Sequence, residues 1–155
     1  NSLYLDCVEI NEDYLNHSAA TKVYRAKQDD KPVAVVLQST APDGYSGNID
    51  ILSAIYIDGT IAGVRVIEHK ETPGLGDKVE IRRSDWITSF NGKRPTSLKD
   101  TSWAVKKDGG EFDAFTGATI TPRAVISAVK RASLYTQNQH QDLFNSTNVC
   151  GVNDD

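Results

Sequence analysis

The chain has 155 residues, of which 39% are hydrophobic and 25% are charged, with a formal net charge of −4 at pH 7. This balance is typical of a globular domain, and the acidic net charge argues against nucleic acid as a partner, because phosphate backbones bind basic surfaces. No apolar run approaches the roughly 20 residues that span a bilayer. Because the chain begins at Asn1 without a signal-like segment, we expect a processed or truncated piece that lacks its membrane anchor.

Two strands are predicted near the start of the chain. Residues 23–26 and 33–38 are rich in strand-forming residues, and the Asp-Asp-Lys-Pro segment between them favours a turn. Residues 41–47 contain Pro, Asp, Ser and two Gly residues, so a loop is expected there. Residues 1–20 show little periodicity, and no element is predicted for them.

A hairpin is predicted next. In residues 51–57, Ile51, Ser53 and Ile55 fall on one face of a strand because successive side chains point to opposite faces. The Asp58-Gly59 pair is a strong two-residue hairpin signal, and the return strand is expected over residues 60–68.

One helix is predicted between this hairpin and residue 91. Asp77 followed by Glu80 resembles a capping box. The apolar residues that follow, up to Phe90, are spaced as on one helical face, which includes Trp86. A short strand is expected at residues 103–105.

The last helix is predicted to run from Pro122 to about Tyr135, with a loose polar tail after Gln137. Hairpins combined with separate helices indicate an α+β fold, in which an antiparallel sheet of hairpin-connected strands packs against a few helices.

Three threonines surround a Gly-Ala pair before the last helix. Thr121 precedes Pro122, which is favoured at a first helical position, so Thr121 is the predicted N-cap. Thr116 and Thr119 then lie on a short loop at the positive end of a helix dipole, a place that attracts phosphate.

Two loops stand out as candidate ligand sites: ETPGLG at residues 71–76 and DAFTGAT at residues 113–119. A bare G-x-G is weak evidence for phosphate or cofactor contact. Considered singly, each loop is better explained as a tight turn that leads into a helix.

Together, the two loops resemble the hallmarks of the covalent FMN-binding domain family. DAFTGAT matches its D-x-x-[ST]-G-A-T motif, ETPGLG matches its second hallmark, and the order of elements agrees over about residues 33–135. The resemblance is closest to the G subunits of Rnf (Rsx) ion-translocating electron-transport complexes. These are related to the C subunit of the sodium-translocating NADH:quinone oxidoreductase.

The resemblance implies that the phosphate of FMN is joined to the hydroxyl of Thr119 as a phosphodiester, giving phosphothreonyl-FMN. A separate FMN transferase, which uses FAD and a divalent metal, would make this bond. Glu71 and Thr72 would bond to the flavin ring edge or the ribityl hydroxyls, and Asp113 either orients the loop or a metal during transfer or is an ordinary turn residue. The expected cofactor-binding residues are Tyr45, Glu71, Thr72, Pro73, Gly74, Leu75, Gly76, Asp113, Thr116, Gly117, Ala118, Thr119, Ile120 and Thr121. No catalytic or metal-binding residue is expected. Trp86, Trp103 and Phe115 are assigned to the core.

The resemblance also implies a place in the cell. The domain would lie on the periplasmic side of the inner membrane, held by an N-terminal helix missing here, and would pass electrons among the other subunits of a membrane complex that moves ions. Residues 1–22 would follow the anchor, residues 23–137 would form a single FMN-binding domain, and residues 138–155 would form a tail. The alternative is an extracytoplasmic module that binds an anionic ligand without redox chemistry.

The remaining polar candidates stay open or are set aside. Cys7 and Cys150 either form one disulfide, which would imply an oxidising compartment, or remain unrelated thiols. His69 and Glu71 lie two residues apart, but no third ligand has a helpful spacing, so zinc is set aside.

Overall fold

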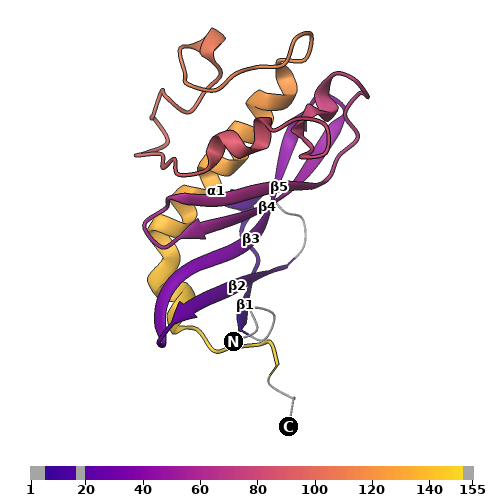
Figure 1. The fold of residues 1–155 in the computed structure, drawn as a ribbon. Helices are drawn as coiled ribbons and strands as arrows, with labels where there is room; N and C mark the ends of the chain where they lie inside the picture. The colour runs from indigo at the N-terminus through magenta and orange to yellow at the C-terminus, as the bar shows by residue number, and fades with distance from the viewer. Residues whose placement is uncertain (1–5, 17–19, 152–155) are drawn as a thin grey trace.

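The computed structural model describes residues 6–16 and 20–151, so part of the expected N-terminal segment and the last four residues lie outside it. Five strands form one antiparallel sheet in the order β1-β2-β3-β4-β5. Their bounds are β1 Cys7–Ile10, β2 Thr21–Gln28, β3 Lys31–Gly44, β4 Gly47–Tyr56 and β5 Ile61–Glu68. The single long helix α1, Ile120–Asn145, packs mainly against β3 and β4 (Figure 1). The predicted α+β fold is confirmed.

The core lies between the sheet and α1. One face of β3 and one face of β4 are buried, as the period of two requires, and Thr40 on the other face of β3 is buried as well. The residues on the two buried faces are Val35, Leu37, Ser39 and Ala41 on β3, and Ile49, Ile51, Ser53 and Ile55 on β4. Val125, Ala128, Val129 and Ala132 of α1 are buried as well, at the spacing of one helical face.

The first predicted loop is much shorter than residues 41–47. Ala41 pairs with Ile49, and β3 continues to Gly44, so the reversal is left to Tyr45 and Ser46 before β4 begins. The pairing slips between Ala41 and Gly44. A Cβ atom at Gly44 would lie 2.3 Å from the carbonyl oxygen of Gly47, which explains the glycine in this tight turn.

The helix predicted from the capping box at Asp77 and Glu80 is wrong. Two short 3₁₀ turns form instead, over Gly76–Val79 and Trp86–Phe90. The side chain of Asp77 turns back to accept from the backbone N–H of Gly74, and the strand expected at residues 103–105 is reduced to one bridge between Val105 and Phe112.

Residues 69–119, the long connection from β5 to α1, lie over the half of the molecule that contains the start of α1 (Figure 1). Buried aromatic residues of this connection form a cluster: Trp86, Phe90, Trp103, Phe112 and Phe115. Neighbouring ring centroids lie 4.8–5.8 Å apart, in the range of favourable aromatic pairs. The assignment of Trp86, Trp103 and Phe115 to the core is confirmed.

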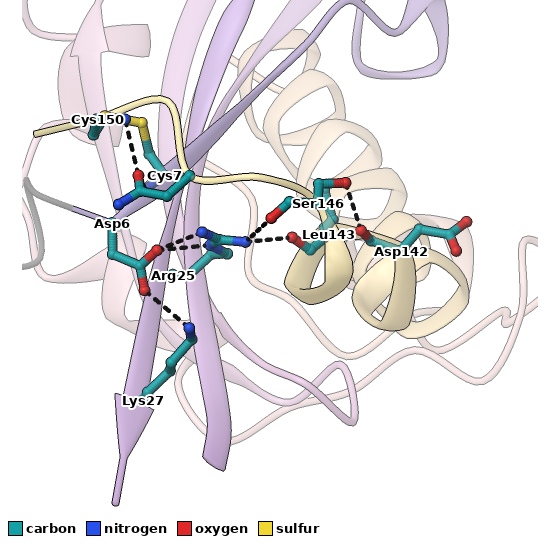
Figure 2. A network of polar contacts seen from close by, with 9 residues as sticks. Asp6, Cys7, Arg25, Lys27, Asp142, Leu143, Ser146 and Cys150 are labelled. Atoms are coloured by element: carbon teal, nitrogen blue, oxygen red, sulfur yellow. Dashed lines mark hydrogen bonds and ion pairs between the residues drawn. A yellow bond between two sulfur atoms is a disulfide. The ribbon is translucent and has the colours of Figure 1, made fainter. Parts of the chain in front are cut away.

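The opposite end of α1 is fixed to β1 and β2 (Figure 2). The predicted tail is wrong at this point, because α1 continues past Gln137 to Asn145. Arg25 of β2 is buried and donates to the backbone carbonyls of Leu143 and Ser146, and its guanidinium also binds Asp6. Cys7 and Cys150 form a disulfide with a Cα–Cα distance of 5.4 Å, so the open question of their pairing is resolved.

Loss of the disulfide is expected to destabilise the fold. The bond joins residues 143 positions apart, so replacing Cys7 and Cys150 together by Ser should lower the free energy of unfolding by about 2–5 kcal/mol. Urea unfolding followed by tryptophan fluorescence measures the change, and reduced wild-type protein should unfold at the same urea concentration as the double variant. An unchanged midpoint would contradict the structural role of the bond.

Arg25→Lys should also destabilise the protein, because an ammonium group cannot reproduce the fork that meets Asp6 and two carbonyl groups. We expect a loss of about 1–3 kcal/mol of unfolding free energy, since buried acceptors are left without donors. Arg82→Lys is the control, because the Arg82 side chain is 83% exposed and its replacement should change stability by less than about 0.5 kcal/mol. Equal losses in the two variants would refute this role for Arg25.

Candidate functional site

Three segments meet where α1 begins: the β3–β4 turn, the loop that starts at Glu71 and the loop that ends at Thr119. They enclose a cavity of about 310 Å³, which lies at the small end of the range for ligand pockets. Its lining residues are Tyr45, Thr72, Leu75, Gly76, Gly117, Ala118, Thr119, Ile120 and Thr121. The structure therefore brings the two loops that the sequence analysis selected together with Tyr45, another expected cofactor-binding residue.

The loop over residues 113–119 is anchored in the core by Phe115. Phe115 is buried and packs edge-to-face on Trp86, whose indole Nε1 donates to the carbonyl of Asp113 at 2.8 Å. The loop then turns through Gly117, whose φ of +76° suits glycine. The N–H of Ala118 bonds back to the carbonyl of Phe115. This anchored turn delivers Thr119 to the start of α1.

The loop over residues 71–76 is a compact turn. The N–H of Leu75 donates to the carbonyl of Thr72, and Gly74, at a φ of +81°, donates to the carboxylate of Asp77. Leu75 also lies against the second loop, since a Cβ atom added to Gly117 would be 3.5 Å from Leu75 Cδ2. The two sequence motifs are thus direct neighbours.

The prediction that Thr121 is the N-cap of the last helix is wrong, while Thr116 and Thr119 precede that helix as expected. Thr119, not Thr121, is the residue before α1, and its side chain makes no capping hydrogen bond. Thr121 lies inside the first turn, is 1% exposed and donates its hydroxyl to Glu71 Oε1 at 2.5 Å. Thr116 is exposed and does not line the cavity. Of these three, Thr119 is therefore the one that lines the cavity and whose hydroxyl neither caps the helix nor binds Glu71.

The Glu71 side chain lies beside the cavity and accepts hydrogen bonds from residues that border it. The side chain is buried, and its two oxygens accept from the backbone N–H groups of Tyr45 at 3.0 Å and Ser46 at 2.8 Å, and from the Thr121 hydroxyl. No sequence spacing signals the contact, because Glu71 and Thr121 are 50 positions apart.

Other predicted site residues lie at the margin. Pro73 and Gly74 are exposed and do not line the cavity. Asp113 is also exposed, and its carboxylate pairs with Lys106 at 2.8 Å, an interaction that raises the pKa of that lysine. His69 takes part in the loop framework: its Nδ1 accepts from the N–H of Glu71, and its Nε2 lies 2.7 Å from Glu80. The hydrogen bond from His69 is the main reason that the pKa of Glu80 is lowered.

Comparison with known proteins gives consistent results. The model of the FMN-binding domain matches residues 44–133. The G subunit of the ion-translocating oxidoreductase complex of Escherichia coli O157:H7 is 65% identical over 122 residues, which cover 79% of this chain and 59% of that protein. The corresponding protein of Erwinia tasmaniensis is 53% identical over 151 residues, which cover 97% of this chain and 71% of that protein.

A solved structure agrees with these sequence relatives. The crystal structure of Shewanella oneidensis NqrC matches with a TM-score of 0.62 and 27% identity, covering 88% of this chain and 70% of that one. The chain spans only 59% of the length of the Escherichia coli relative, so the match concerns the domain that carries the site. On these grounds, the chain belongs to the FMN-binding domain family, among relatives that are named as G subunits of ion-translocating oxidoreductase complexes.

Proposed function

We propose that this domain carries FMN covalently on Thr119, as a phosphodiester, and serves as an electron-transfer subunit of a membrane-bound, ion-translocating redox complex. The observation that carries the proposal is the position of Thr119. It lies at the start of α1, lines the cavity and makes no capping hydrogen bond. The family match and the names of the relatives support the choice of FMN.

The start of α1 suits a phosphate group. The first N–H groups of a helix lack intrahelical partners, and the helix dipole favours a negative charge there by roughly 0.3–1 kcal/mol. This energy is too small to retain a cofactor by itself. A covalent bond to the Thr119 hydroxyl would overcome that limit, with the exposed Gly117 leaving room beside the loop.

The mouth of the cavity suits a flat aromatic ring. Tyr45, Leu75 and Ile120 line the cavity and remain 69%, 40% and 46% exposed. Apolar side chains that stay exposed around a concave site are typical of ligand or partner contact. Thr72 adds a hydroxyl that is able to bond the polar edge of a flavin. When bound, FMN would supply the electron-accepting and electron-donating chemistry.

Electron transfer within a complex is inferred from the relatives, which are named as subunits of ion-translocating oxidoreductase complexes. On this proposal, the partners are the other subunits of such a complex, and a membrane helix before residue 1 holds the domain at the inner membrane. Among the residues that the structure describes, no helix has the length and apolarity needed to cross a membrane.

An extracytoplasmic location is supported by the disulfide between Cys7 and Cys150, because such bonds persist in oxidising compartments and are rare in the cytosol. Attachment of FMN on that side would require a separate FMN transferase. With FAD as donor, the Thr119 oxygen would form the new bond to phosphorus, AMP would leave, and the hydroxyl proton would be released.

The proposal is tested by intact mass spectrometry of the denatured protein after co-expression with an FMN transferase. Wild-type protein should gain the mass of FMN less one water, located by peptide mapping on the peptide that contains Thr119. Thr119→Ala should remove the added mass, because no oxygen is left to accept the phosphoryl group.

Thr116→Ala is the matched control, since Thr116 lies on the same loop but outside the cavity, and it should keep the modification. Wild-type protein without added mass, beside a transferase active on another flavoprotein, would contradict the proposal and favour the module without redox chemistry. Covalent flavin that remains in Thr119→Ala would show that the attachment site is wrong.

A further inference from the structure

We infer that Glu71 is a positioning residue that sets the three walls of the cavity relative to one another and does not bind the flavin itself. The inference extends the proposed function, because the positioned walls are those that would receive FMN. It rests on the hydrogen bonds and the close packing around the Glu71 side chain.

The Glu71 carboxylate joins two groups of the β3–β4 turn to one group in the first turn of α1, which directly follows the loop that ends at Thr119. Its partners are the N–H groups of Tyr45 and Ser46 in the β3–β4 turn and the Thr121 hydroxyl in the first turn of α1. Glu71 itself directly precedes Thr72 in the third segment. Since Tyr45, Thr72 and Thr121 all line the cavity, one side chain connects all three walls.

Burial makes these contacts strong determinants of geometry. Glu71 is 4% exposed, and a buried charge must be fully hydrogen-bonded to be tolerated. A carboxylate only accepts hydrogen bonds and has about four lone-pair sites, and donors from the protein use three of them here. Moving any wall would therefore leave part of a buried charge without a partner.

The packing around this contact leaves no space for adjustment. A Cβ atom at Gly76 would lie 2.6 Å from Thr121 Oγ1 and 2.9 Å from Glu71 Cβ. Only glycine permits the loop to approach so closely without moving these groups. The second glycine of the ETPGLG motif thus serves the contact between Glu71 and Thr121.

The backbone of Glu71 is fixed from outside the cavity. Its N–H donates to His69 Nδ1 at 2.9 Å, so that nitrogen is an acceptor and the ring proton lies on Nε2, which faces Glu80 at 2.7 Å. The side chain therefore extends from an anchored backbone toward the walls. This arrangement explains why Glu71 is absent from the cavity lining although it touches all the segments that form it.

Hydrogen exchange in the protein without flavin tests the positioning directly. Glu71→Gln keeps the shape but replaces one acceptor oxygen by an NH₂ donor, which cannot accept from a backbone N–H. We expect amide exchange to become about tenfold faster at Tyr45 or Ser46, whichever faces the NH₂ group, because that is the factor for one lost hydrogen bond. Glu68→Gln is the matched control, because Glu68 is exposed at the end of β5. In this variant, amide exchange of Tyr45 and Ser46 should match wild type.

A second pair of variants keeps the test decisive if Glu71→Gln fails to fold. Thr121→Val removes the hydroxyl and keeps the side-chain shape, whereas Thr121→Ser keeps the hydroxyl. Thr121→Val should speed exchange at Tyr45, which shares Oε1 with Thr121, and Thr121→Ser should not. Exchange at Tyr45 equal to wild type in both variants would overturn the inference.

The protein with FMN attached offers a second measurement, the fluorescence anisotropy of the flavin, which general destabilisation would not change. Well below the melting temperature, the fluorescence anisotropy of covalent FMN should fall in Glu71→Gln and remain at the wild-type value in Glu68→Gln. A lower melting temperature with unchanged anisotropy and exchange would show a purely structural role and overturn the inference. Wild-type protein without FMN on Thr119 would refute the proposed function, while the exchange experiment would still decide the role of Glu71.

Discussion

Helix α1 is tied to the rest of the protein at both ends, and the geometry of the cavity depends on this constraint. At its C-terminal end, Arg25 binds the carbonyls of Leu143 and Ser146, and the disulfide lies next to them. At its N-terminal end, Thr121 bonds to Glu71. A helix of 26 residues is about 39 Å long at 1.5 Å per residue. Fixing both ends therefore defines where its first residue lies.

The polar contact at the N-terminal end follows from the composition of the loops. Segments rich in Gly, Thr and Pro offer few apolar side chains, so they cannot be fixed by hydrophobic packing alone. Their buried N–H groups must nevertheless find acceptors. Glu71 supplies acceptors for the β3–β4 turn, and Asp77 supplies one for Gly74. Hydrogen bonds to carboxylates thus fix the loops, whereas burial of apolar side chains fixes β3 and β4 in the sheet.

Features set by nearby residues were predictable from the sequence. The Asp58-Gly59 turn and the buried face of Ile51, Ser53 and Ile55 depend on neighbours in the chain, and both agree with the structure. The two loop motifs were also recognised, and they meet at one cavity. Their individual contacts were not predictable, because the partners of Glu71 are 25 to 50 positions away.

Errors arose where distant contacts override local preference. The last turns of α1 are polar in sequence, yet Leu143 is buried there and its carbonyl accepts from Arg25. The predicted helix after Asp77 gives way to 3₁₀ turns, with Trp86 held by the aromatic cluster and by the carbonyl of Asp113. Local capping signals contribute only about 1 kcal/mol, less than the burial of one aromatic side chain, about 1.5–3 kcal/mol. Tertiary packing therefore decided both segments.

The form of the cavity bears on why a covalent bond would be used at all. At about 310 Å³, it is near the lower limit for small-molecule pockets, and the side chains of Tyr45, Leu75 and Ile120 at its mouth stay exposed. On the proposed function, an open site of this kind would leave part of the flavin accessible to a redox partner. The same openness would weaken noncovalent binding, because less apolar surface is removed from water. A bond at Thr119 would retain the flavin without enclosing its ring. Retention of the cofactor and access of a redox partner to the ring would then no longer conflict.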